Sequence, residues 1–269
     1  MAVAGLLAIL ALTAYGQEMG TPRRIWSAGT ARVLPEGRWE TGVFQPVRVG
    51  TSGPWEWSVH PIWFFQIPNV RIKVAHPGRL GWQAASRHSV VYPTPLLRRL
   101  QKKGLGFRAL AEIDFGGIIT ADPTVGEIPH MILSRHEIIL THRLGSSGLV
   151  TAKGGVALAL RSGKLDERTT IDLPIVFPRL GVLYDGFGMN AGVDVVRRLA
   201  RGLDYLVDSD LLFLPVSSVK AFEHKGLLIW TRSRKFQVIA GYKLVFGEYP
   251  FGTRWHLFPL LDLQWGWSR

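Results

Sequence analysis

The sequence contains no cysteine. This absence excludes a disulfide scaffold, a cysteine nucleophile, a thiolate metal site and a lipid anchor on cysteine. Long apolar runs are also missing, because no window after the N-terminus approaches the roughly 18 uninterrupted apolar residues that a transmembrane helix needs. No phosphate-loop or nucleic-acid-binding motif is present, so we expect no cofactor and no nucleic-acid partner despite a formal net charge of +12.

The N-terminus carries the clearest local signal. Ala4 to Ala14 is an apolar stretch of the length found in secretory signal peptides, and Ala14-Tyr15-Gly16 then offers small residues for cleavage. We expect a signal peptide at 1–16, an N-terminal extension at 17–37 and a β domain at 38–269. Met1-Ala2-Val3 lacks the usual basic residue, so a buried helix or a retained anchor is the alternative. The expected destination is the periplasm, the outer membrane or the outside of the cell.

What the chain does have is a β-sheet composition, with 30 glycines, 16 prolines and 11% aromatic residues. Trp55 to Ile67 alternates apart from Ile62 and Phe64, and a turn at Pro68-Asn69 would start a new strand. In a strand this places Trp55, Trp57, Trp63 and Phe65 on one side and Glu56, Ser58 and His60 on the other. In a soluble sandwich the aromatic side would face the core, whereas in a membrane barrel it would face lipid. Periodicity alone does not separate these two.

Similar patterns recur along the chain. Candidate strands lie at 39–49, 55–67, 70–74, 83–92, 107–115, 131–142, 148–160, 168–177, 180–195, 203–213, 226–231, 236–246 and 255–268. They predict an all-β fold, a closed antiparallel transmembrane β-barrel of about 12 strands, with 10 to 14 allowed. Pro46, Pro61, Pro174 and Pro178 fall inside candidate strands, so bulges or shorter strands are needed there.

The C-terminus supports the membrane interpretation. Leu261, Leu263, Trp265 and Trp267 share one face, and Asp262, Gln264, Gly266 and Ser268 share the other. This segment resembles the last strand of bacterial outer-membrane β-barrels, although Ser268-Arg269 follow the final aromatic residue. The resemblance implies an outer-membrane location and recognition by the barrel-assembly machinery. We therefore expect lipid-facing aromatics at Trp55, Trp57, Trp63, Phe65, Trp265 and Trp267.

The basic residues suggest two kinds of site. Arg48, Arg71 and Lys73 would lie in the lumen, where Glu40 and Glu56 neutralise part of their charge. Two clusters would contact anionic lipid headgroups or lipopolysaccharide phosphates, or would simply be solvated loops. Their members are Arg98, Arg99, Lys102, Lys103, Arg197, Arg198 and Arg201. The leading hypothesis is a non-enzymatic barrel, either a narrow anion-favouring channel or a structural membrane component, of unspecified oligomeric state.

The sequence contains few residue patterns that suggest catalysis, and an enzyme is the less favoured interpretation. Glu56, Ser58 and His60 share one strand face, as do Ser86 and His88. Neighbours on one strand face stand about 7 Å apart, which disfavours a hydrogen bond between them. His136 and His142 would be about 20 Å apart on a strand, so no metal site is expected. The alternatives are a lipid-modifying outer-membrane enzyme using His60 or His88, and a soluble periplasmic β-domain within an envelope assembly.

Overall fold

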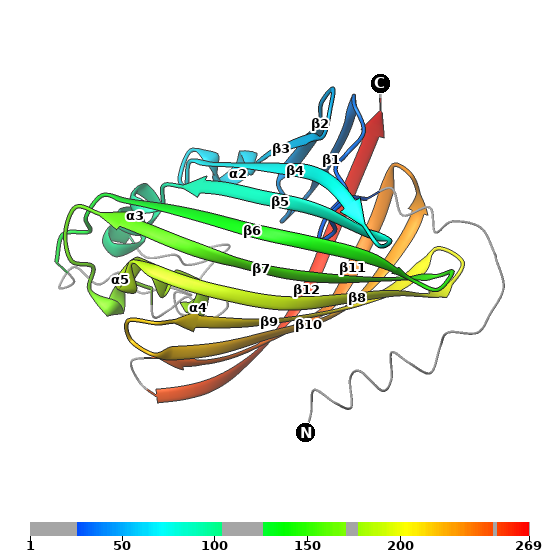
Figure 1. The fold of residues 1–269 in the computed structure, drawn as a ribbon. Helices are drawn as coiled ribbons and strands as arrows, with labels where there is room; N and C mark the ends of the chain where they lie inside the picture. The colour runs from blue at the N-terminus through cyan, green and yellow to red at the C-terminus, as the bar shows by residue number, and fades with distance from the viewer. Residues whose placement is uncertain (1–25, 104–125, 171–176, 250–251, 269) are drawn as a thin grey trace, which may run out of the picture.

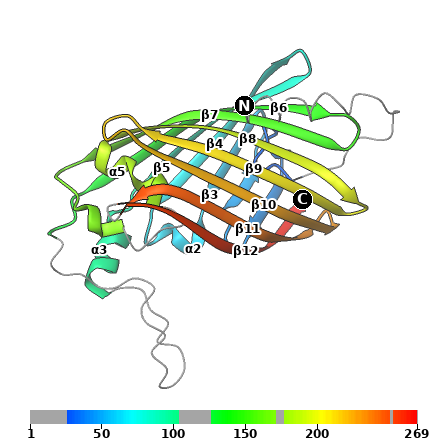
Figure 2. The same ribbon diagram turned by 90° about the horizontal axis from the view of Figure 1, so that it is seen from below.

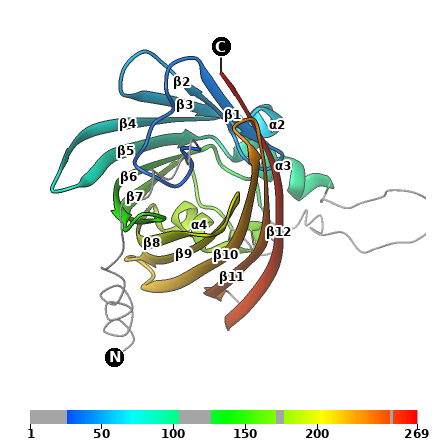
Figure 3. The ribbon, with the colours of Figure 1, turned by 90° about the vertical axis from the view of Figure 1, so that its right-hand side faces the viewer.

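The chain folds into a closed barrel of twelve antiparallel strands (Figures 1 and 3). The computed structural model describes residues 26–103, 126–170, 177–249 and 252–268. The strands are β1 (Arg38–Gly42), β2 (Val47–Gly50), β3 (Trp55–Val59), β4 (Asn69–Arg79), β5 (Trp82–Val91), β6 (Met131–Leu144), β7 (Gly148–Arg161), β8 (Phe187–Ala200), β9 (Leu203–Leu214), β10 (Val219–Ser233), β11 (Phe236–Tyr249) and β12 (Gly252–Ser268). Each strand pairs with its sequence neighbours, and β1 pairs with β12. The predicted barrel and its strand number are confirmed.

The two ends of the barrel differ. Tight turns gather at the end near the C terminus (Figure 2), such as Leu80-Gly81, where both residues have positive φ, as a two-residue hairpin turn requires. Longer connections and all the described helices lie at the opposite end. These helices are α2 (Pro61–Phe64), α3 (Thr94–Lys103), the 3₁₀ turn η1 (Glu167–Thr170), α4 (Phe177–Leu180) and α5 (Val182–Asp185). None of the described helices is long and apolar enough to cross a membrane.

The wall has a polar inner face and an apolar outer face. On β10, Glu223 points into the lumen and is 1% exposed, whereas Leu228 and Trp230 point outward and are 46% and 48% exposed. Outward aromatic side chains gather near each end. Those near the tight turns are Trp39, Trp55, Trp57, Trp82, Trp230, Phe236, Trp265 and Trp267, and those near the long connections are Phe187, Phe213, Phe222, Phe246 and Trp255.

The spacing of these two aromatic belts matches a bilayer. Trp255 and Trp265 stand about ten residues apart on β12. At a rise of about 3.3 Å per residue and a strand tilt of about 40°, this separation is about 25 Å along the barrel axis. The apolar band of a transmembrane barrel has about this height.

Two predicted strands are wrong in their extent. The candidate at 39–49 is interrupted between β1 and β2, where the Phe44 N–H is held by Asp262 Oδ1 at 3.0 Å. The candidate at 55–67 ends at Val59, because Pro61 begins α2. Trp63 and Phe65 therefore do not belong to a strand, and the side chain of Trp63 lies outside the described part. Phe65 follows α2 and is 85% exposed.

The segment from 168 to 177 is not a strand where it is described, since η1 covers its start and α4 its last residue. The candidate at 180–195 begins with α5, and its strand starts only at Phe187. Candidate strand 107–115, Pro174 and the proposed signal peptide lie outside the described residues. Pro46 precedes β2, whereas Pro61 and Pro178 lie in α2 and α4, so none of these three removes a ladder hydrogen bond.

β12 has a long edge that β1 does not cover. Its pairing with β1 runs only from Gln264 to Ser268, extended by one bond from the Val43 N–H to the Leu263 carbonyl. On its other side β12 pairs with β11 along nearly its whole length. Leu263 directs its backbone toward β1, so by strand alternation Pro259 does the same. Pro259 has no N–H, and it lies at a position where no described strand offers an acceptor for one.

We predict that Pro259→Ala changes the stability of the barrel little, because no described ladder bond depends on that position. Leu244→Pro, on β11 between two full neighbours, removes a ladder bond and destabilises the barrel strongly. The measurement is the temperature at which the folded band on a detergent gel converts to the unfolded band. Equal shifts for both variants would contradict the assignment of an uncovered edge.

Candidate functional site

The lumen holds the largest group of buried charged side chains in the described structure. Its end near the tight turns is filled by residues 26–37, which run inside the barrel before β1. The Ala31 N–H donates to Thr141 Oγ1 at 2.8 Å, and Ala31 packs with Ala85 and Ile139 in one buried cluster. The Leu34 N–H donates to Glu56 Oε2 at 3.0 Å. Hydrogen bonds to wall side chains thus hold this segment in place.

Two of the three predicted lumen cations are neutralised. Arg48 Nη2 lies 3.1 Å from Glu40 Oε2, and both side chains are almost completely buried. Lys73 Nζ lies 3.2 Å from Glu56 Oε2 and also donates to the Ser27 carbonyl at 3.1 Å. These cations therefore fix the wall and the N-terminal segment. Sequence reasoning placed them on the inner face, but strand register decides which carboxylate faces each one.

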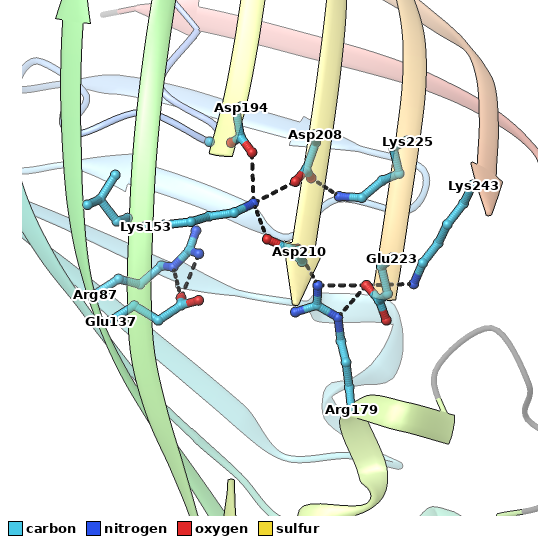
Figure 4. Close-up of a pocket in the computed structure, with 12 residues that line it drawn as sticks. Arg87, Glu137, Lys153, Arg179, Asp194, Asp208, Asp210, Glu223, Lys225 and Lys243 are labelled. Carbon is cyan, nitrogen blue, oxygen red and sulfur yellow. Dashed lines mark hydrogen bonds and ion pairs between the residues drawn. The ribbon is translucent and has the colours of Figure 1, made fainter. Parts of the chain in front are cut away.

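A denser ion-pair network lies deeper in the lumen (Figure 4). Lys153 Nζ on β7 contacts three carboxylates, those of Asp194 at 2.9 Å, Asp208 at 2.8 Å and Asp210 at 2.9 Å. Lys225 makes a further ion pair with Asp208. These residues come from four consecutive strands, β7 to β10, and adjacent strand pairing aligns them. Their alternation along 203–213 was visible in the sequence, but their partners were not.

Arg179 on α4 joins this network from the opposite end. The helix α4 lies inside the ring of strands (Figure 3), and Arg179 Nη2 reaches Asp210 Oδ2 at 2.6 Å and Glu223 Oε2 at 2.7 Å. Burial alone would lower the pKa of the Arg179 guanidinium, but the carboxylates of Glu223 and Asp210 raise it above its ordinary value. Arg179 therefore stays charged and anchors α4 in the lumen. No sequence pattern marked this residue, because 168–177 and its surroundings were interpreted as strands.

A polar cavity of about 220 Å³ remains inside this network, bounded by Gly29 of the N-terminal segment and by Arg179 of α4. Its lining carries both signs of charge, and the cations and carboxylates pair with one another (Figure 4). Segments from both ends of the barrel thus border one polar cavity in the lumen.

The inner face of β4 to β6 carries surplus positive charge. Arg87 Nη2 binds Glu137 Oε2 at 2.6 Å. Arg135 donates from Nη2 to the Arg179 carbonyl at 2.8 Å. Arg71 lies on the same face as Lys73 and is exposed to the lumen, with Arg87, Glu137 and Arg135 as charged neighbours. Among the described residues, no carboxylate lies within ion-pair distance of Arg71. Three arginines thus face one carboxylate here.

The structure does not bring Glu56, Ser58 and His60 together as a catalytic group. Glu56 pairs with Lys73, whereas His60 lies beyond the end of β3, where its backbone N–H donates to Asn69 Oδ1 at 2.9 Å. Ser86 and His88, by contrast, are joined on the outer face, with Ser86 Oγ 3.1 Å from His88 Nε2. The expectation that strand spacing would keep these two apart is wrong, because their side-chain rotamers lean toward each other.

The two basic clusters lie at opposite ends of the barrel. Arg98, Arg99, Lys102 and Lys103 belong to α3, beside the long connections. Leu97 and Leu100 of α3 are buried, whereas Arg99 and Lys102 are exposed, and the side chain of Lys103 is outside the described part. Arg197, Arg198 and Arg201 are exposed at the end of β8 and in the tight turn that follows. The clusters therefore cannot form one patch.

Four of the predicted lipid-facing aromatics lie on the outer face of strands. Trp55 and Trp57 of β3 are each 43% exposed, and Trp265 and Trp267 of β12 are 39% and 44% exposed. Within the described part of the chain, no group of three or more His, Asp or Glu side chains is arranged to hold a metal ion.

Comparisons with known proteins give the following. No protein-family model matches the sequence, and no curated protein sequence matches it. Two matching solved structures are of OmpT of Vibrio cholerae, one described as outer-membrane expressed and one as an in-vitro folded outer membrane protein. They are 7% and 8% identical, cover 83% of this chain and 65% and 64% of their own, and have TM-scores of 0.41 and 0.40. The chain thus spans less than two thirds of their length.

The network around Lys153 predicts a large loss of stability when this lysine is removed. In Lys153→Met the carboxylate of Asp194 keeps no ion pair among the described residues, so we expect a loss of about 3 to 5 kcal/mol in the free energy of unfolding. When Asp194→Asn is added to Lys153→Met, the uncompensated charge is removed, and we expect part of the lost free energy of unfolding to be recovered.

The control is Arg168→Met, which breaks an exposed pair with Asp166 and costs about 0 to 1 kcal/mol. Urea unfolding in detergent micelles measures all three variants. A loss in Lys153→Met no greater than in the control would rule out a structural role for this network.

Proposed function

We propose that the chain is an outer-membrane β-barrel protein whose lumen is a narrow, anion-favouring channel held closed by residues 26–37. The observation that carries the membrane assignment is the apolar outer band between two aromatic belts on a closed barrel. Within lipid, backbone polar groups must be satisfied internally, and closure of the barrel does this except along the part of β12 that β1 does not cover. Trp and Tyr belong at the two lipid–water interfaces, where the belts would lie.

The anion preference rests on the inner face of β4 to β6. There Arg71, Arg87 and Arg135 outnumber Glu137, and Arg71 is exposed to the lumen. Anions passing this face would meet a net positive potential, which a low-dielectric wall strengthens. The remaining lumen charges largely pair with each other and contribute little to selectivity.

Closure rests on the segment before β1. Residues 26–37 bind the wall through the Ala31 N–H and the Leu34 N–H, and Arg179 fixes α4 from the other end. Conduction therefore requires displacement of at least one of these elements. A purely structural role in the membrane is the alternative, favoured by the same filled lumen.

Anionic lipid headgroups are the proposed partners of both basic ends. Arg99 and Lys102 on α3 would meet lipopolysaccharide phosphates, while Arg197 and Arg201 would meet phospholipid headgroups on the other side. The assembly machinery would recognise β12, whose outer face carries Trp265 and Trp267.

The membrane assignment predicts that residues 17–269 need detergent or lipid to stay in solution. In micelles the unboiled protein should migrate on a gel as a compact band that shifts on boiling. A protein that is monomeric and soluble without detergent would contradict the assignment and favour a periplasmic domain.

The closed channel predicts a redox-controlled conductance. Ala31→Cys with Ala85→Cys places two thiols in one buried cluster of a chain that has no other cysteine. In planar bilayers the oxidised form should stay silent, whereas the reduced form should open with anion preference. The single-cysteine variants are the controls and should ignore the redox state.

Selectivity is tested in the reduced form. Arg71→Gln should lower the anion-to-cation permeability ratio, and Arg201→Gln, in an exposed turn, should leave it unchanged. Cation preference in the unmodified protein, or no conductance in any redox state, would defeat the channel and leave the structural role.

A further inference from the structure

A chain of hydrogen-bonded side chains lies on the outer wall of β4, β5 and β6. Ser86 and His88 point outward from β5, because Ala85 and Arg87 between and beside them face the lumen. His88 stands directly opposite His136 of β6. On the other side of β5, His76 of β4 lies diagonally across the β4–β5 pairing from Ser86. All four groups are polar, on a face that also carries Ser134 and His142 but is otherwise made of aliphatic and aromatic side chains.

The distances are compatible with the following set of protons. His88 Nδ1 lies 2.9 Å from His136 Nδ1, so one of these nitrogens donates and the other accepts. If His88 Nδ1–H donates, His88 Nε2 is an acceptor, and Ser86 Oγ at 3.1 Å donates to it. His76 Nε2 lies 2.8 Å from the same Ser86 Oγ and can donate to it. The imidazoles of His76 and His88 thus both contact the Ser86 hydroxyl, and His136 orients the imidazole of His88.

Such a chain is costly where it stands. Ser86 and His88 are four and six residues from Trp82, which lies in the aromatic belt near the tight turns. At the rise and tilt used above, they sit about 10 to 15 Å from that belt, within the apolar band. Ionisable side chains facing lipid are expensive and mark functional sites by default. This inference therefore rests on the membrane location proposed above, but it does not depend on conduction.

We propose that Ser86 is a nucleophile and His88 its general base in a site that hydrolyses the acyl esters of membrane lipids. Ser86 Oγ attacks the ester carbonyl carbon as its proton moves to His88 Nε2. The tetrahedral oxyanion then expels the lipid alkoxide, which takes that proton. Water, activated by His88 in the same way, attacks the acyl-serine and releases a fatty acid and the free hydroxyl.

The other two histidines have separate roles. His136 is a positioning residue, because it accepts the His88 Nδ1–H and so holds the base in the correct tautomer and orientation. In the tautomer that carries its proton on Nε2, His76 directs an N–H at Ser86 Oγ and stands near the oxyanion, which forms two bonds from that atom. Ser86 itself is 6% exposed beneath the two exposed rings, and exposed side chains change rotamer within nanoseconds.

The surroundings favour a lipid ester over a water-soluble one. The outer-face neighbours of the chain are aliphatic, with Ile138 54% exposed, Val90 46% exposed and Leu140 38% exposed. An acyl chain can lie along these side chains while its ester meets Ser86. Phospholipids and the lipid portion of lipopolysaccharide both offer such esters.

The wall also contains a matched pair without the extra histidines. Ser209 Oγ lies 2.9 Å from His224 Nδ1 on the outer face of β9 and β10. In the described part of the structure, no second histidine contacts this serine and no side chain orients His224 by a hydrogen bond. This pair serves as the control for an ordinary Ser–His hydrogen bond.

The first experiment measures whether Ser86 is activated. The full chain in detergent micelles is treated with an alkyl fluorophosphonate, and the labelled peptide is identified by mass spectrometry. We expect labelling at Ser86, abolished in Ser86→Ala and slowed at least about 100-fold in His88→Gln. Ser209→Ala and His224→Gln should label like the unmodified protein.

The role of His136 has its own readout. His136→Gln keeps an amide oxygen that can accept the His88 Nδ1–H, so it should label faster than His136→Phe. Equal rates for these two variants would overturn the positioning role. Heat-shifted gel mobility checks that every variant forms the barrel.

The second experiment identifies the lipid. Fatty acid release is measured from mixed micelles that contain either glycerophospholipid or lipopolysaccharide, with Ser86→Ala as the blank. Release of fatty acid from only one of the two lipids identifies that lipid as the substrate. Labelling of Ser86 without release in either arm overturns the lipid substrate, and equal or absent labelling at Ser86 and Ser209 overturns the nucleophile. Since the probe reaction needs neither a bilayer nor an open lumen, a failed conductance experiment leaves it unaffected.

Discussion

The fold depends on closing one hydrogen-bond ladder around the ring. β1 and β12 lie at opposite ends of the chain, and their five paired positions complete the barrel. In the proposed membrane location, a sheet left open there would expose unpaired N–H and C=O groups, which lipid cannot satisfy. Few residues close the ring, since β1, β2 and β3 have only four or five residues each while β12 has seventeen. The uncovered edge of β12 includes Pro259, which has no N–H and therefore needs no acceptor there.

Closure also separates two environments, and the side chains follow from that. Most charges turned inward form ion pairs, and Lys153, Arg179 and Glu223 each bind more than one partner. The lumen brings these charges within ion-pair distance of one another. It therefore becomes a packed electrostatic core that also fixes the N-terminal segment and α4. Outside, the same alternation leaves mostly aliphatic and aromatic side chains, interrupted by the chain that contains Ser86 and His88 and by the pair of Ser209 with His224.

Particular residues show how far sequence reasoning reaches. Trp55, Trp265 and Trp267 were assigned to an outward apolar face because alternation with polar residues is a local property of a strand. The placement of Trp63 in a strand is wrong, because the aromatic alternation continues past Pro61 although the backbone turns there into α2. Ser86 and His88 were found but discounted, since mean strand spacing ignores the rotamers that bring Oγ and Nε2 together. His76 was never considered, because it lies on another strand.

The sequence by itself determined the alternation, the approximate number of strands and the face on which each side chain lies, because these depend only on the period of an extended chain. Tertiary structure decided which cation meets which carboxylate, where residues 26–37 and α4 lie, and that three histidines and a serine join in one chain. These features depend on strand register and closure. Register and closure set contacts between residues far apart in the chain, as between Ala31 and Thr141 or between Arg38 and Ser268, and no local pattern encodes such contacts.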